Sequence, residues 1–223
     1  MTDSALPSLR RRANPSLVLA VVAGIFALLF LAGIAFGSTW IPLDTVANVV
    51  LGGGERTDKL VVLQLRMPRV ALATIAGAAM ALAGYLLQRI TRNELASPGV
   101  LGVVDGAALG VVLFMAIFTN QSNALTVSVA WQPLAAVLGA LGAISLVFLL
   151  SGRQASSATR LLLFGIAIAA AAKALTTIFM LIGPIYQASQ AARWLAGAVN
   201  AANWTEIQYM LAVLVPAAIL AAV

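Results

Sequence analysis

The sequence contains no cysteine and no histidine. Without cysteine there is no disulfide framework, and without either residue there is no thiolate or imidazole ligand for a structural metal or a haem iron. The Ser/His/Asp and Cys/His sets of nucleophilic catalysis are absent for the same reason. We therefore expect no catalytic residues, no metal ligands and no cofactor, and any metal that the protein handles must arrive already chelated.

Charged residues are also scarce. They make up 9% of the 223 residues, whereas 62% are hydrophobic and the mean hydropathy is +1.02. Soluble domains carry about 25% charged residues and about half apolar residues, so this composition indicates an integral membrane protein. The net charge of +6 does not predict nucleic-acid binding, because the 13 basic residues are spread over short segments between hydrophobic runs. Membrane topology and contact with lipid explain them better.

Six hydrophobic runs are long enough to cross a bilayer, which takes roughly 20 helical residues. The runs are continuous and show no alternation of period two, so they predict helices rather than a β-barrel. We predict an all-α, polytopic membrane protein with about six transmembrane helices. The runs cover residues 16–36, 69–88, 99–118, 130–150, 161–182 and 206–223.

Basic residues predict the orientation. Residues 1–15 are expected to form a cytoplasmic tail, and the first run, at about 21 residues, is too long for a cleaved signal peptide, so it is read as a retained span. The four tryptophans then fall at the outer side, as an aromatic belt would. Segment 186–207 is less hydrophobic and predicts a surface helix there. The inner segments carry Arg10, Arg11, Arg12, Arg89, Arg92, Arg153 and Arg160, and the outer ones carry Arg193 and the exceptional group Arg56, Lys59, Arg66 and Arg69.

Proline and glycine predict where helices begin and pack. Pro68 suits the first turn of the second span, and Ser97 followed by Pro98 predicts an N-cap and first residue for the third. Small residues at spacings of three and four let helices approach closely, either for ordinary packing or beside a transport path. Two groups show this spacing: Gly77 and Gly84 with Ala81 in the second span, and Gly102, Gly106 and Gly110 in the third.

Two charges fall inside predicted spans. Asp105 would lie about 9 Å from the cytoplasmic edge and Lys173 about 19 Å from it, at 1.5 Å per residue. A difference of about 10 Å disfavours a direct ion pair, and Lys173 could instead extend toward the outer face. Because a charge at such depth costs about 2.5–3.5 kcal/mol, each should face protein, water or a partner.

Four segments, in this order and spacing, resemble the permease family that imports iron–siderophores, haem and vitamin B12, the membrane subunits of type II ABC importers. The segments are LRMPR, AGAAMALAGYLLQRITRNELASPGVLGVVDGAALG, RLLLFGIAIAA and RWLAGAVNAANW. The resemblance implies about ten spans per subunit, of which residues 1–223 would be the N-terminal portion of the permease domain. The hydrophobic end at Val223, without a polar flank, suggests a truncated sequence.

The resemblance also implies partners and site residues. A second permease subunit or half, two cytoplasmic ATP-binding subunits and an extracytoplasmic substrate-binding protein would complete an importer in the bacterial cytoplasmic membrane. No G-x-x-x-x-G-K-[ST] motif occurs here, so ATP hydrolysis is expected on separate subunits and this chain is not expected to be an enzyme. Arg66 and Arg69 match the arginines that meet acidic residues of the binding protein. Arg89, Arg92, Asn93 and Pro98 fall in the cytoplasmic loop.

The chain departs from the family pattern at two positions. Asp105, after Val104, stands where a small polar residue is usual, and Glu94 stands where proline is common. The leading interpretation is a permease for an iron–siderophore or related chelate. Asp105 and Lys173 are also compatible with an alternative interpretation, an ion-coupled secondary transporter. The end at Val223 is compatible with a third, a non-transporting remnant of a permease. The chelate, and whether the permease pairs with itself or a sister subunit, are left open by the sequence.

Overall fold

The computed structural model describes residues 14–37, 39–94, 96–120, 124–152, 158–197, 199 and 202–222. The described parts of the chain contain helices and no strand, apart from an isolated bridge between Thr119 and Leu125. Arg10, Arg11, Arg12 and Arg153, and most of the predicted tail, lie outside the described residues. The elements are α1 (Pro15–Ala35), α2 (Leu43–Val50), α3 (Arg56–Lys59), η1 (Leu60–Arg66), α4 (Met67–Thr91), α5 (Val103–Ile117), η2 (Val129–Trp131), α6 (Gln132–Ser151), α7 (Ala158–Ile182), α8 (Ile185–Leu195) and α9 (Trp204–Ala222).

Five helical runs are long and apolar enough to cross a membrane, which confirms the predicted all-α, polytopic fold. They are Pro15–Ala35, Arg56–Thr91, Val129–Ser151, Thr159–Ile182 and Trp204–Ala221. The remaining predicted run, 99–118, forms α5, which has only 15 residues. At 1.5 Å per residue α5 is about 22 Å long, shorter than a hydrocarbon core of about 30 Å.

The chain divides into two compact units. The first comprises residues 1–72 with Ala202–Trp204, and the second comprises residues 73–201 with Thr205–Val223. In the first unit, α1, α2 and η1 pack around a buried apolar cluster. Its fully covered members are Ile34, Ile41, Val46, Val49 and Val62.

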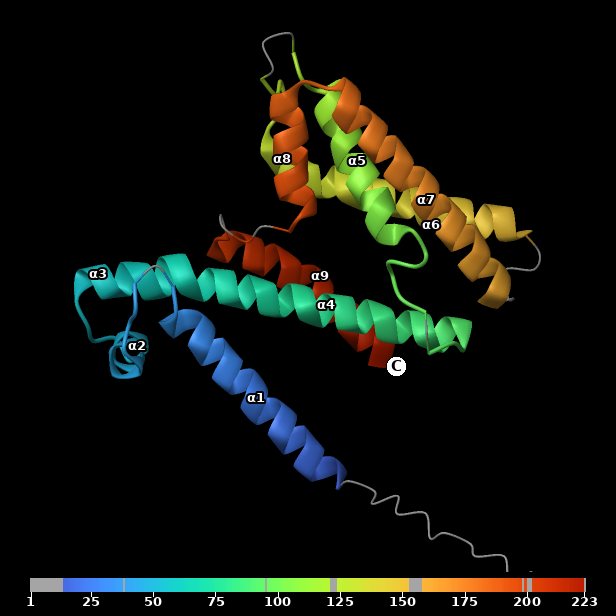
Figure 1. Ribbon diagram of the computed structural model, residues 1–223. Coiled ribbons are helices and arrows are strands. Elements are labelled where there is room, and N and C mark those ends of the chain that lie inside the picture. The colour runs from blue at the N-terminus through green and yellow to red at the C-terminus, as the bar shows by residue number, and fades with distance from the viewer. Residues whose placement is uncertain are drawn as a thin grey trace, which may run out of the picture. The chain divides into compact units, whose positions relative to one another are not determined.

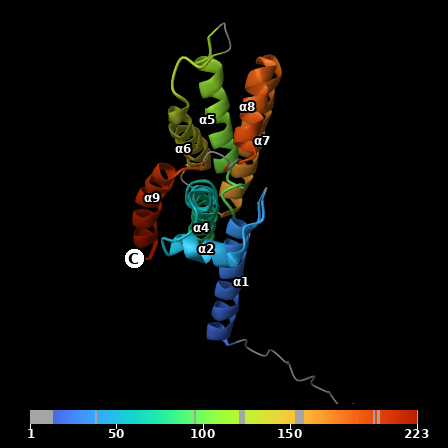
Figure 2. The same ribbon diagram turned by 90° about the vertical axis from the view of Figure 1, so that its left-hand side faces the viewer.

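The second unit is organised around α5, which contacts α6, α7 and α8. Figure 2 shows α5 between α6 on one side and the pair α7 and α8 on the other. Helix α8, predicted as a surface helix, buries Ala191 against Val112 and Met115 of α5, with Trp194 packed on the same cluster. A separate cluster of Leu101, Val147 and Leu161 lies where α5 begins.

The predicted start of the second span was wrong. The helix runs without a break from Arg56 to Thr91, so Pro68 lies inside it rather than at its first turn. A π-helical segment, η1, directly precedes Pro68. A proline ring clashes with the carbonyl four residues earlier in an α-helix, and the wider π turn relieves that clash, which explains why the helix continues through Pro68.

The predicted start of the third span was also wrong. Ser97 and Pro98 lie in a series of turns, and α5 begins at Val103, after Gly102 with φ +72°. The amide N–H of Val100 donates to the Ser97 carbonyl, and that of Val103 donates to the Pro98 carbonyl. The chain therefore stays non-helical for several residues beyond the predicted cap, with its backbone groups paired in turns.

Candidate functional site

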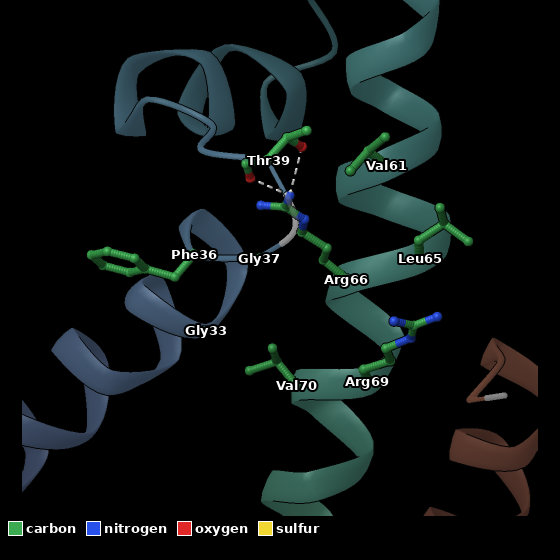
Figure 3. Close-up of a pocket in the computed structure, with 9 residues that line it drawn as sticks. All are labelled: Gly33, Phe36, Gly37, Thr39, Val61, Leu65, Arg66, Arg69 and Val70. Carbon is green, nitrogen blue, oxygen red and sulfur yellow. Dashed lines mark hydrogen bonds between the residues drawn. The ribbon is translucent and has the colours of Figure 1, made fainter. Parts of the chain in front are cut away.

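The Arg66 side chain makes four hydrogen bonds within the first unit. It is only 8% exposed and projects from η1 toward the end of α1. Its Nη1 donates to the carbonyls of Ile34 at 3.0 Å and Ala35 at 2.8 Å. Its Nη2 donates to the Thr39 carbonyl and, at 3.1 Å, to the Thr39 hydroxyl (Figure 3).

These bonds make Arg66 a cap for α1. The last carbonyls of a helix have no partner within the helix, and a cation beside them also interacts favourably with the helix dipole. Gly37 permits this approach, because a Cβ there would lie 2.8 Å from the Arg66 guanidinium carbon. We call Arg66, its carbonyl acceptors on Ile34 and Ala35, and Thr39 the Arg66 cluster.

Pro68 leaves a second backbone group without its usual partner. In the π register of η1 the Met67 N–H donates to the Val62 carbonyl, five residues earlier. The next donor in that register would be Pro68, which has no N–H, so the Leu63 carbonyl is left over. The indole Nε1 of Trp204, 141 residues further along the chain, donates to this carbonyl at 3.0 Å. The Trp204 indole N–H thus supplies the donor that the Leu63 carbonyl lacks because of Pro68.

A pocket of about 460 Å³ opens beside the Arg66 cluster. Figure 3 shows Arg66 pointing to Thr39, whereas the Arg69 guanidinium points away from it, on another side of the helix. Arg69 is half-buried and has no hydrogen bond or ion pair within the residues that the structure describes. The lining residues are Gly33, Phe36, Gly37, Thr39, Val61, Leu65, Arg66, Arg69 and Val70.

The two arginines predicted to dock the binding protein therefore lie in different environments. Arg66 was expected at an exposed rim, but its guanidinium is buried and already has four protein acceptors. Arg69 retains a charged group that a partner can reach. The docking role stays a prediction, and it falls mainly on Arg69.

The glycines of the predicted third span lie at close backbone contacts. A Cβ on Gly106 would meet Ala143 and lie 2.7 Å from the Gly139 carbonyl oxygen of α6. A Cβ on Gly110 would meet the Ala135 carbonyl and lie 3.0 Å from the Gly139 Cα. Gly102 faces α7 instead, where a Cβ would lie 3.0 Å from the Ala169 amide nitrogen. These glycines bring α5 against two helices.

Gly77 and Gly84 differ from that group. Beyond the adjacent turns of α4 itself, no atom of the described chain lies within 4 Å of a Cβ built on either residue. Their part in close packing or in a transport path stays a prediction, and the face that carries them in α4 is free of contacts at these two points.

The predicted cytoplasmic loop closes α4 with a compact C-cap. Arg92 adopts φ +50°, and the Asn93 N–H donates to the Gln88 carbonyl at 3.2 Å. This left-handed residue followed by a six-to-one hydrogen bond is the Schellman pattern. Gln88 also donates to the Glu94 carbonyl at 2.9 Å, and the Arg89 guanidinium donates to the Tyr85 hydroxyl at 3.1 Å. Arg92 and Glu94 are exposed, and Pro98 belongs to the turns that lead toward α5.

Asp105 and Lys173 lie nearer in depth than predicted. Helices α5 and α7 run in the same direction, as Figure 1 shows, with Gly102 beside Ala169 at one end and Met115 clustered with Met180 at the other. Asp105 is three residues past Gly102 and Lys173 is four past Ala169, so the two are within about 2 Å in depth at 1.5 Å per residue. The predicted separation of about 10 Å was wrong because Gly102, which directly precedes α5, lies beside Ala169, eleven residues into α7, rather than beside the first turn of α7.

The two charges nevertheless form no ion pair in the described parts of α5 and α7. Asp105 is half-buried in the first turn of α5, where the helix dipole stabilises an acid. Lys173 is exposed. The dipole at the start of α5 gives Asp105 an electrostatic role that its predicted position inside a longer helix did not offer.

Taken together, the long apolar helices and the glycine contacts between them define a multi-pass helical membrane protein. The model of the FecCD transport family matches residues 25–223. The chain therefore belongs to the FecCD transport family.

Three relatives show the range of the similarity. The chain is 39% identical to the probable siderophore transport system permease protein of Bacillus subtilis over 192 residues, 86% of this chain and 56% of that protein. It is 35% identical to the iron(3+)-hydroxamate import system permease protein of Bacillus subtilis, over 89% of this chain and 59% of that protein. It is 32% identical to the ferric enterobactin transport system permease protein of Escherichia coli over 186 residues, 83% of this chain and 52% of that protein.

The fold also resembles that of a solved structure, an inward-facing conformation of a proposed metal-chelate type ABC transporter. The TM-score is 0.69 at 23% identity, over 86% of this chain and 57% of that chain. The likeness shows the same fold. This chain spans little more than half the length of the relatives it matches.

Two features of the site were not predicted from the sequence. The bond from Trp204 to Leu63 joins residues 141 positions apart, and the cap from Arg66 joins η1 to α1. Pro68 was the available signal for the first, because a proline inside a helix always leaves one carbonyl without its donor. The second had no comparable signal, since a membrane-edge arginine is equally compatible with solvent, lipid or a partner.

Proposed function

We propose that this chain is part of the permease subunit of an ATP-driven importer that carries an iron–siderophore, or a related metal chelate, across the bacterial cytoplasmic membrane. The observation that supports it most strongly is membership of the FecCD transport family over residues 25–223. The relatives named as siderophore, hydroxamate and enterobactin permeases indicate a ferric chelate as the substrate class.

The proposed importer contains a second permease subunit or half, two cytoplasmic ATP-binding subunits and an extracytoplasmic substrate-binding protein. The N-terminus lies in the cytoplasm, so the Arg66 cluster and the pocket with Arg69 face the binding protein. The permease carries out no chemistry, and ATP is hydrolysed on the partner subunits. The chelate then crosses by alternating access between two sides of the helical assembly.

Uptake driven by ATP tests this proposal. Proteoliposomes that hold this permease with its ATPase subunits are supplied with the binding protein and a siderophore loaded with radioactive iron. We expect uptake to require ATP, to stop when the ATPase nucleotide-binding lysine is replaced, and to persist after the proton gradient is dissipated. Uptake that collapses with the proton gradient while ATP is intact would establish the ion-coupled carrier that Asp105 and Lys173 suggest, and no uptake under either condition would identify a non-transporting remnant.

Docking of the binding protein is tested on Arg69, since its side chain can change without opening the Arg66 cluster. We expect Arg69→Glu to weaken capture of the binding protein by about tenfold, or about 1.4 kcal/mol, because a favourable contact with an acidic side chain becomes a repulsive one. The measurement is equilibrium binding of the labelled binding protein to the importer in nanodiscs. Arg56→Glu is the matched control, since it makes the same charge change at an exposed residue of α3 outside the pocket.

Two results complete the docking test. An opposite charge change on the binding protein should restore its affinity for the Arg69→Glu importer. Equal binding by wild-type, Arg69→Glu and Arg56→Glu importers would refute the assignment.

A further inference from the structure

Lys173 has an unusual position on α7. It lies fifteen residues after Ala158 and nine before Ile182, and its side chain is exposed. A 25-residue helix is about 37 Å long, so if it is centred in a core of about 30 Å, the Lys173 Cα lies about 10 Å below the nearer boundary. A lysine side chain reaches about 6 Å, which is too short to bring its ammonium to the headgroups.

An exposed ammonium at this depth cannot be covered by lipid alone. Inserting a charge this far into a bilayer is unfavourable, so intramembrane charges face a polar partner or water. Asp105 lies at a similar depth but forms no ion pair with Lys173 in the described residues of this unit. Lys173 therefore faces water, or a polar group outside the described residues of this unit.

The residues around Lys173 divide the exposed side of α7 into two edges. Ala170 and Thr177 lie three and four residues from Lys173 and share its edge, and all three are exposed. The opposite edge carries Leu175 and Ile178, which are 44% and 48% exposed. Within one turn of Lys173 its edge is thus small and polar, with the apolar Ile166 two turns earlier, whereas the other edge suits lipid or apolar protein.

We propose that the edge of Ala170, Lys173 and Thr177 lines the substrate pathway, and that the Lys173 ammonium makes a transient contact with the anionic oxygen ligands of a ferric chelate in transit. This inference rests on the proposed function. Fe³⁺ is held by hard oxygen donors such as hydroxamate, catecholate or carboxylate, which carry negative charge, so the contact is complementary. A lone, compact and strongly hydrated ammonium holds an anion weakly enough to release it, as passage requires.

The absence of cysteine from the chain gives a direct test of which edge meets water. Lys173→Cys introduces a single thiol, and Leu175→Cys places the same thiol at almost the same depth on the opposite edge. In the complete importer in proteoliposomes, a charged methanethiosulfonate reagent should modify Cys at 173 at least tenfold faster than at 175. Saturating ferric siderophore, delivered by the binding protein, should slow the reaction at 173 severalfold and leave that at 175 unchanged.

Transport by charge variants gives the second readout. We expect Lys173→Glu to lower uptake of a negatively charged ferric chelate at least tenfold, and Lys173→Arg to retain it within about twofold, at equal amounts of assembled importer.

Equal labelling at 173 and 175 would overturn the inference, as would rapid labelling at 173 without protection by the chelate. The first result would indicate cover by lipid or by a helix of a second permease, and the second would indicate a water-filled space that the substrate does not enter. Wild-type importer is assayed in parallel. If the wild type shows ATP-driven uptake while Lys173→Glu is unaffected, only the role of Lys173 fails, whereas absent wild-type uptake refutes the proposed function itself.

Discussion

Gly139→Val is expected to prevent α5 and α6 from packing and to remove most of the folded protein. A Cβ at Gly139 would meet the Gly106 carbonyl and lie 2.9 Å from the Gly110 Cα and 3.0 Å from the Gly110 amide nitrogen. The obstacles are backbone atoms, which cannot rotate away as a side chain can. Overpacking against side chains costs about 1–3 kcal/mol, so here we expect at least about 3 kcal/mol.

A matched substitution on the same helix separates packing from composition. Gly142→Val adds the same side chain three residues away, where no described atom beyond the adjacent turns of α6 lies within 4 Å of the built Cβ. Thermal unfolding in detergent and the monodisperse fraction in size-exclusion chromatography measure both variants. Gly139→Val should fail both measurements and Gly142→Val should pass both; similar behaviour of the two variants would show that the α5–α6 contact does not require glycine.

The second large effect is expected at Arg66. Arg66→Ala removes the guanidinium bonds to the carbonyls of Ile34, Ala35 and Thr39, of which the Ala35 carbonyl still accepts from the Ile41 N–H. Each buried acceptor left without a donor costs about 1–3 kcal/mol. We expect the variant to lose about 2–5 kcal/mol of stability, seen as a lower thermal midpoint and a lower membrane level. Arg66→Lys should recover only part of this loss, because one ammonium cannot match a planar guanidinium that serves two carbonyls and Thr39 together.

Arg69→Ala is the control for Arg66, since it removes the same charge from the other arginine of the pocket. It should leave the free energy of unfolding within about 0.5 kcal/mol of wild type, as substitutions away from buried networks usually do. Equal stability of the Arg66→Ala and Arg69→Ala variants would contradict the capping role. The pair of variants also distinguishes docking from folding, because a loss of binding-protein capture with normal stability is expected only at Arg69.

The hydrophobic runs predicted the fold class well because length and hydropathy are properties of local sequence. All six predicted runs contain a helix, and five reach membrane-spanning length. Helix ends were harder to predict. Ser97 and Pro98 are residues that commonly begin a helix, yet α5 begins only at Val103. The reason is that Gly102 can adopt φ +72° and pack against the α7 backbone. That choice depends on a tertiary neighbour that local sequence does not specify.

The sequence likewise predicted some of the helix-packing glycines correctly and others not. The spacing of Gly102, Gly106 and Gly110 predicted close packing of small residues, and the structure places each against another backbone. The same spacing rule applied to Gly77 and Gly84 finds no neighbour within the described chain. Sequence identified which residue types could pack, whereas the identity of the packing partner depends on how the helices assemble.

Asp105 shows how an error in a helix boundary spreads to electrostatics. The sequence placed Asp105 inside a continuous helix, about 9 Å from the cytoplasmic edge and about 10 Å from the depth of Lys173. In the structure Asp105 is in the first turn of α5, and Gly102 before that turn lies beside Ala169 of α7, so Asp105 is nearly level with Lys173. The later start of α5 therefore changed the helix-dipole environment of the acid, and the packing of that start beside Ala169 changed its depth relative to Lys173.

The bond between Trp204 and Leu63 has a consequence for biosynthesis. The Leu63 carbonyl is made 141 residues before the indole that binds it. At a synthesis rate of about 5–20 residues per second, that carbonyl waits roughly 7–28 s for its donor. During this interval α1, α2 and η1 have all emerged, but the first unit lacks its last bond. Its assembly is therefore completed by the translation of a distant helix, and a ribosome stalled before Trp204 would leave the Pro68 region open to chaperones and proteases.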